Sequence, residues 1–353
     1  MLELLKIKYP IVQAPMAGSD NAEFVAAASE AGILGSLGAQ YRTPEQITSV
    51  IQDIRNHTDK PFAVNVFALP ELEKPSNEQI DSAKQHLTSY YDRFKTKVPS
   101  NQSVVDLIDS EAQLQAILEA NVPVVSFTLG QLDKRWIDSF KANSTVVIGT
   151  ATNVKEAIAL EAAGVDAITA QSTEAGGHRG TFIGAVETSL IGGFALIPQI
   201  ADAVQIPVIA AGGIMDGRGI AAAIALGAKG VQMGTAFLTT SECPVHENYK
   251  RMIVTHEADD TVITKVFSGG AARSIRNVYI EENREAPLLP FPFHNSLTRP
   301  FRTEANKAGD TDYTNLWSGQ NGRLARPISI SELVHQLVGE TNEVLVKLGS
   351  SRI

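Results

Sequence analysis

The chain has 353 residues, 44% of them hydrophobic, with 27 glycines and a single cysteine, a composition typical of a folded protein and not of a disordered one. Its 30 Lys and Arg against 39 Asp and Glu give a net charge of −9, which argues against nucleic acid as a partner. The lone Cys243 excludes an internal disulfide, and no segment has the character of a signal peptide or a membrane span. We therefore expect a cytoplasmic protein with no membrane partner.

From Pro10 onward, short apolar runs rich in β-branched residues alternate with longer amphipathic stretches, which is the pattern of parallel βα units. The predicted strands cover residues 11–16, 34–39, 62–67, 122–128, 145–151, 167–172, 207–212 and 230–235. Eight such repeats favour an α/β fold closed into a (β/α)8 barrel over a doubly wound open sheet.

Two segments interrupt the alternation. Residues 69–103 are polar and charged and predict an insertion with its own helix after the third strand. Residues 239–326 are too long for an ordinary loop and predict a smaller cap domain between the last strand and the last helix. The amphipathic stretch 330–348 would supply that last helix. The predicted domains are therefore a barrel of residues 1–238, completed by 327–353, and an inserted cap of residues 239–326 that roofs the substrate cavity.

Glycines cluster where the last two strands end. Gly212 and Gly213 follow the seventh strand, and the run Gln232-Met233-Gly234-Thr235 ends the eighth. In this fold, phosphates bind at the loops after these two strands, where backbone amides approach a ligand without an intervening Cβ. Any one of these glycines could serve only a tight turn, but two clusters on adjacent strands favour a phosphate site.

The sixth strand ends at Gln171 and leads into Gly176-Gly177-His178. A histidine held by glycines at the catalytic end of a strand titrates near neutrality and can act as a general base. The alternative is an ordinary surface histidine, which is our interpretation of the other six. Because no histidine pair has the spacing of metal ligands, we predict no metal site.

Two further strand ends carry candidate residues. Ala14-Pro15-Met16 end the first strand, and Asn65 lies in the third. Met16 and Asn65 are either core and strand-end residues or part of the wall around a planar cofactor, with Asn65 at its polar edge. The residues alone thus predict a phosphate-bearing ligand or cofactor beside a histidine, and they do not choose between a flavin and a sugar phosphate.

The motifs, taken in order, resemble those of nitronate monooxygenases, formerly called 2-nitropropane dioxygenases, over nearly the whole chain. The matching strings are residues 13–18, 174–180, 211–219, 230–235 and the cap string Leu316-Trp317-Ser318-Gly319-Gln320. The resemblance implies an FMN-dependent barrel that oxidises alkyl nitronates, such as propionate 3-nitronate, with dioxygen to a carbonyl compound and nitrite. It also implies that His178 is catalytic, either as a base for neutral nitroalkanes or as a donor that steadies an anionic nitronate.

The predicted cofactor-binding residues combine the strand ends with the family motifs. They are Ala14, Pro15, Met16, Asn65, Gln171, Gly176, Gly212, Gly213, Gln232, Met233, Gly234 and Thr235.

Two alternatives remain open. The flavin-type enoyl-acyl-carrier-protein reductase shares the barrel, FMN and an AGGH string, so an NAD(P)H-dependent reductase of that type or of the quinone reductase type is the first. The long segment 181–189, Arg179 after the histidine, and Trp317 favour the monooxygenase. The second is a non-redox barrel that binds a phosphate ligand, with His178 incidental. The sequence leaves the physiological nitronate and the oligomeric state open.

Overall fold

Eight parallel strands form the inner layer of the computed structural model, which describes residues 1–350. Their order in the sheet is β1-β9-β8-β6-β5-β4-β3-β2, and a parallel bridge between Val12 and Leu34 brings its two edge strands together. The strands are β1 (Ile11–Gln13), β2 (Gly35–Gly38), β3 (Phe62–Phe67), β4 (Val124–Thr128), β5 (Val146–Ala151), β6 (Ala167–Gln171), β8 (Val208–Ala211) and β9 (Gly230–Met233). Each of these strands lies within a predicted segment, and the predicted (β/α)8 barrel is confirmed.

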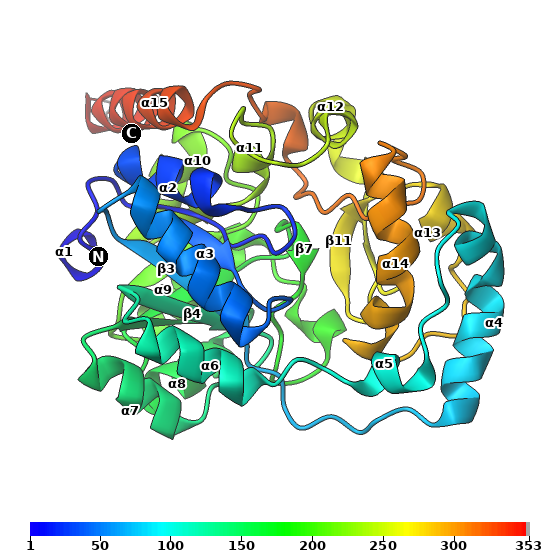
Figure 1. Cartoon of the computed structure of the whole chain (residues 1–353). Coiled ribbons are helices and arrows are strands. Elements are labelled where there is room, and N and C mark those ends of the chain that lie inside the picture. Colours follow the sequence, from blue (N-terminus) through cyan, green and yellow to red (C-terminus); the bar gives the residue numbers. More distant parts are fainter. Residues whose placement is uncertain (351–353) are drawn as a thin grey trace.

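Helices surround this barrel (Figure 1). They are α2 (Ala22–Glu30), α3 (Pro44–His57), α6 (Ser110–Glu119), α7 (Lys134–Ala142), α8 (Val154–Ala163), α9 (Gly193–Ala203), α10 (Gly217–Ala225) and α15 (Ile330–Ser350). Helix α3 begins at Pro44 because Thr43 and Gln46 form a reciprocal capping box, which satisfies two backbone amides of the first turn. The long C-terminal helix α15 packs on α10 and α2. None of the helices within residues 1–350 is long and apolar enough to cross a membrane.

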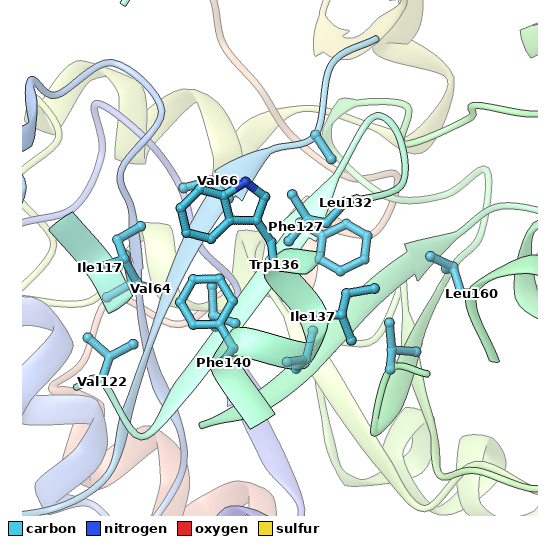
Figure 2. Packing of buried hydrophobic residues seen from close by; sticks show 14 of the residues in the cluster. Val64, Val66, Ile117, Val122, Phe127, Leu132, Trp136, Ile137, Phe140 and Leu160 are labelled. Atoms are coloured by element: carbon cyan, nitrogen blue, oxygen red, sulfur yellow. The ribbon is translucent and has the colours of Figure 1, made fainter. Parts of the chain in front are cut away.

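The layer between strands and helices is apolar and closely packed. Figure 2 shows Trp136, Ile137 and Phe140 of α7 beside Val64 and Phe127 of the neighbouring strands. Burial of a large apolar side chain contributes about 1.5–3 kcal/mol. This contact surface packs α7 against the strands, whose pairing with one another sets their register and the positions of their ends.

The inward-facing side chains change from apolar to polar along the strands. Ala63, Val124 and Ile148 belong to an apolar cluster near the amino ends, which the short helix α1 (Leu2–Leu5) helps to close through Leu5. Two residues further along the same strands, Asn65, Ser126 and Thr150 face a cavity. Because side chains alternate along a strand, residues two apart share one face. Hydrophobic packing thus closes the barrel at the amino ends of the strands, and polar side chains line a cavity at their carboxyl ends.

A cap covers the carboxyl ends of the barrel strands (Figure 1). Its sheet consists of β10 (Thr261–Thr264), β11 (Ala272–Ile275) and β7 (Gly177–His178), so the histidine loop of the barrel forms the third strand of the cap sheet. Its helices are α12 (Glu247–Thr255), α13 (Val278–Glu282) and α14 (Phe293–Lys307), with short 3-10 turns at η2 (Ala258–Asp260) and η3 (Gly322–Leu324). Two short elements belong to barrel loops, the 3-10 turn η1 (Val186–Ser189) before α9 and the helix α11 (Thr235–Leu238) directly after β9. The predicted cap between the last strand and the last helix is confirmed.

The predicted insertion after the third strand contributes to this cap. Its helices α4 (Asn77–Arg93) and α5 (Asn101–Val105) pack on α14, away from the barrel (Figure 1). Tyr90 and Tyr91 of α4 join Tyr279 and Phe301 in an aromatic core. The residue limits proposed above for the two domains stay a prediction, but the hydrophobic core of the cap combines two segments that are far apart in the sequence.

Candidate active site

A cavity of about 520 Å³ lies between the carboxyl ends of the strands and the cap. This volume falls within the range of small-molecule sites. The structure brings every sequence-predicted site residue into its wall: Ala14, Pro15, Met16, Asn65, Gln171, Gly176, His178, Gly212, Gly213, Gln232, Met233, Gly234 and Thr235.

Gln171 holds the histidine loop at the cavity edge. Its Nε2 donates to the carbonyl oxygen of His178 over 2.9 Å, and its Oε1 accepts from the amide of Gly180 over 2.8 Å. The loop is also paired with the cap, because His178 lies opposite Ala272 of β11. The side-chain amide of Gln171 is therefore used at both ends to fix the backbone around His178.

The imidazole of His178 lies in a mostly apolar environment. Its ring centre is 4.9 Å from that of Phe291 and 5.4 Å from that of Trp317, and its Nε2 lies 2.8 Å from the hydroxyl oxygen of Ser268. Burial, with a smaller contribution from the positive charge of Arg302, lowers the pKa of His178 from 6.5 to about 4. The expectation that His178 titrates near neutrality is therefore wrong. The cap desolvates the ring, and His178 is neutral at physiological pH.

A cationic face of α14 lines the cap side of the cavity. Asn295, Arg299, Arg302 and Asn306 are spaced so that they share one side of this helix, while Phe301 on another side enters the aromatic core. The guanidinium of Arg302 is buried and donates to three neutral oxygens, those of Asn295, Thr298 and Asn315. Among residues 1–350, no Asp or Glu lines the cavity. The electrostatic environment therefore favours an anionic ligand.

The glycine loops after β8 and β9 present free backbone amides. Within residues 1–350, the amides of Gly213, Gly234 and Thr235 form no hydrogen bond. Gly213 has φ of +70°, a conformation that favours glycine, and a Cβ at Gly234 would stand in the cavity wall, 3.5 Å from Ala14 Cβ. These amides and the absence of side chains form a cradle of the kind that binds phosphate.

The cap string Ser318-Gly319-Gln320 is attached directly to this cradle. The Gly319 amide donates to Thr235 Oγ1 over 2.9 Å, and the Gln320 amide donates to the Glu174 carbonyl over 3.1 Å. A Cβ on Gly176 would lie 2.6 Å from the Gly319 nitrogen, so the close approach of the two backbones requires glycine there. The family-like string thus connects cap and barrel.

Two buried charges support the loop between β6 and α9. Arg179 donates to the carbonyl oxygens of Gln171, Ser172 and Ser189. The carboxylate of Glu156, fully buried, accepts from the amides of Phe182 and Ile183. Arg179, which the sequence places in a family-like motif, therefore ties this loop to the end of β6 that carries the site.

Two other histidines differ from the prediction. His256 and His294 were expected at the surface, but both are buried. His294 accepts from the Leu289 amide through Nδ1, and its Nε2 lies 3.1 Å from the Val266 carbonyl. These contacts indicate a structural role, since neither residue lines the cavity. Within residues 1–350, no group of three or more His, Cys, Asp and Glu side chains could hold a metal ion.

The cap residues that complete the site, and Phe67 at the end of β3, are not predicted by the sequence. Ser268 precedes a glycine pair, which could have marked it as part of a tight loop. Arg299 and Arg302 share a polar helical stripe in a segment that we treated only as a cap. Phe67 and Phe291 carry no signal in the sequence that distinguishes them from core residues.

Comparisons with known proteins agree with this site. The model of the nitronate monooxygenase family matches residues 1–340. A probable nitronate monooxygenase of Staphylococcus haemolyticus is 41% identical over 352 residues, which cover 98% of this chain and 97% of that protein. One from Staphylococcus aureus strain N315 is 41% identical over 351 residues, covering 98% of each chain.

Solved structures show the same relationship. A nitroalkane oxidase from Streptomyces ansochromogenes superposes with a TM-score of 0.91 at 38% identity, covering 98% of this chain and 99% of that one. FabK from Thermotoga maritima gives a TM-score of 0.78 at 30% identity, covering 98% and 97%. The barrel and its site define an oxidoreductase. The chain belongs to the nitronate monooxygenase family.

Proposed function

We propose that this protein uses FMN to oxidise alkyl nitronates, propionate 3-nitronate among them, with dioxygen to a carbonyl compound and nitrite. The observation that carries the proposal is a cavity with three free amides at one end, a neutral histidine beside it and two arginines on its cap side, into whose wall the described residues bring no carboxylate. Family membership and the nitroalkane oxidase neighbour support the same reaction class.

The residues present fit FMN. The amides of Gly213, Gly234 and Thr235 would hold the phosphate, and the open wall at Gly234 leaves space for it. Asn65 donates through Nδ2 to Ser126 Oγ over 2.9 Å, which leaves its carbonyl oxygen available to a donor on the ring system. The chemistry that FMN supplies when bound is electron acceptance from the nitronate and electron delivery to dioxygen.

The charge of the cavity supports an anionic substrate. Arg302 keeps a buried positive charge that no carboxylate within residues 1–350 neutralises. Arg299 adds a second positive charge nearer the solvent, above the ring of Tyr41 at 5.3 Å. A nitronate that carries a carboxylate has two negative groups, which suit two separate cations. The two arginines therefore favour propionate 3-nitronate over an uncharged nitroalkane.

His178 acts as a neutral group in this proposal. Its imidazole carries one proton at physiological pH, so it can donate a single hydrogen bond to a nitronate oxygen from the ring nitrogen that does not face Ser268. Phe67, Phe291 and Trp317 surround the ring and exclude water. Exclusion of water strengthens such a hydrogen bond.

The test is direct. Purified protein is expected to contain a bound flavin that is released on denaturation and identified as FMN by mass. With propionate 3-nitronate it is expected to consume dioxygen and release nitrite. A colourless protein that binds no added FMN would overturn the cofactor assignment, and a yellow protein that consumes NADH but no nitronate would replace the proposal with a reductase.

The remaining proposals concern location and assembly. We propose a cytoplasmic location, supported by the single buried, unpaired Cys243. The substrate partners are a small nitronate and dioxygen.

A further inference from the structure

The inference concerns Ser268, a cap residue that touches the imidazole of His178. Ser268 is 1% exposed and lies in a tight loop whose next residue, Gly269, has φ of +83°. A Cβ on Gly269 would lie 2.2 Å from the Leu289 carbonyl oxygen, so the loop packs closely against the neighbouring backbone and requires glycine there. The backbone that carries the Ser268 hydroxyl is therefore closely packed beside the imidazole ring.

The hydroxyl has three neighbours and one hydrogen. Its oxygen lies 2.8 Å from His178 Nε2 and 3.2 Å from the Gly270 carbonyl oxygen, and it accepts from the Gly270 amide over 3.3 Å. Hydroxyl-to-oxygen hydrogen bonds are normally about 2.5–3.0 Å long, so the contact with the Gly270 carbonyl is long for a donated bond. The contact with Nε2 has an ordinary length. The distances therefore favour a hydrogen bond that the Ser268 hydroxyl donates to His178 Nε2.

The choice of partner determines the tautomer of a neutral imidazole. If Ser268 donates to Nε2, this nitrogen has no hydrogen, and the single imidazole hydrogen must be on Nδ1. Within residues 1–350, the Nδ1 atom of His178 has no hydrogen-bond partner, and it is not fully buried. It therefore remains accessible in the wall of the cavity.

We infer that Ser268 is a positioning residue that donates to Nε2 of His178 and thereby presents an Nδ1–H group to the cavity. This inference rests on the proposed function for its consequence. An Nδ1–H group donates to the oxygen of an anionic nitronate, whereas abstraction of a carbon-bound proton from a neutral nitroalkane needs a free lone pair on Nδ1. Ser268 thus adapts the site to the anion.

The tautomer can be measured without turnover. In protein labelled with ¹⁵N-histidine, long-range ¹⁵N–¹H NMR spectra distinguish a protonated ring nitrogen from an unprotonated one, and His178→Gln identifies the signal among the seven histidines. We expect His178 in the flavin-bound protein to show a protonated Nδ1 and an unprotonated Nε2. A protonated Nε2 would overturn the inference whether or not the protein oxidises nitronates.

Variants test the role of the hydroxyl. Ser268→Ala is expected to give a mixture of the two His178 tautomers and to lower kcat/KM for the nitronate about tenfold, the effect of one well-placed hydrogen bond. Ser268→Thr, which keeps the hydroxyl, is expected to restore the Nδ1–H tautomer. The matched control is Ser274→Ala, because Ser274 is an equally buried cap serine whose hydroxyl donates to the carbonyls of Ile275 and Leu316 and does not touch His178.

The outcomes separate the two claims. Equal His178 tautomers and equal kcat/KM in wild type and Ser268→Ala would refute the positioning role. An equal loss of activity in Ser268→Ala and Ser274→Ala, with no change of tautomer, would refute it as well and indicate a purely structural residue. Failure of the wild-type protein to oxidise nitronates would refute the proposed function and leave the NMR result to decide the role of Ser268.

Discussion

The contact between Gly176 and the cap offers a quantitative test of how the site is assembled. A Cβ at this position would lie 2.6 Å from both the Gly319 nitrogen and the Ser318 carbonyl carbon. These are backbone atoms, so neither can move aside as a side chain would. Gly176→Ala is therefore expected to push the cap string 318–320 away from the cradle.

The expected cost combines crowding with lost hydrogen bonds. An extra methyl in a closely packed site typically costs about 1–3 kcal/mol. The bonds from Gly319 to Thr235 and from Gln320 to Glu174 would lengthen, and each contributes about 0.5–1.5 kcal/mol. We therefore expect a loss of about 3 kcal/mol in the free energy of unfolding. With an unfolding entropy of about 2.1 cal/mol/K per residue, this corresponds to a fall of about 4 °C in Tm for a chain of 353 residues.

The assay is thermal unfolding of the flavin-bound protein, together with the dissociation constant of the flavin. The control is Gly339→Ala, since no atom lies within 4 Å of a Cβ there and the residue is inside α15. This control is expected to stabilise the helix by about 0.5–1 kcal/mol. Equal Tm values for Gly176→Ala and wild type would show that the cap does not depend on this contact, and the account of the cap string would be wrong.

Three further predictions address the cavity. Gly234→Val is expected to lower flavin occupancy, because the new side chain would stand in the cradle. The flavin-free variant is expected to keep its Tm, because the Cβ would make only ordinary contacts, 3.5 Å from Ala14 Cβ and 3.7 Å from Met16 Sδ. Full flavin occupancy in this variant would contradict the assignment of the cradle. Arg299→Gln is expected to raise KM for propionate 3-nitronate about fivefold, which corresponds to about 1 kcal/mol for an exposed charge pair. KM for ethyl nitronate, which has no carboxylate, is expected to stay unchanged. An equal rise of KM for both substrates would show that Arg299 does not bind the substrate carboxylate. Because the pKa of His178 is lowered to about 4, the unfolded state binds its proton at higher pH, so the contribution of His178 to stability is expected to fall as the pH drops from about 6.5 to about 4. His178→Gln should weaken that dependence, and an unchanged pH profile of unfolding in this variant would contradict the lowered pKa.

Much of the barrel could be predicted because its signals are local. Each strand is a short apolar run between helical segments, and eight such repeats indicate a sheet that closes into a barrel. The glycines at 212, 213 and 234 could be placed at the cavity for the same reason, since they directly follow strands. Met16 and Asn65, for which two interpretations were open, line the cavity because inward-facing residues near the strand ends converge there.

The properties of the histidine could not be predicted in this way. The low pKa of His178 depends on burial by the cap and on Arg302, and its tautomer depends on Ser268, which is 90 residues further along the chain. Similarly, the sequence predicts a helix within residues 69–103, but the packing of its Tyr90 and Tyr91 against Phe301 requires the position of α14. Contacts between segments distant in sequence, which no local pattern encodes, determine the chemistry of this site.

The most direct test of the central claim is anaerobic mixing of the purified, flavin-bound protein with propionate 3-nitronate, followed by the visible absorbance of the oxidised flavin. We predict rapid loss of this absorbance with the nitronate, its return when dioxygen is admitted, and no comparable loss with NADH. Rapid bleaching by NADH and none by the nitronate would contradict the account and identify the protein as a flavin reductase.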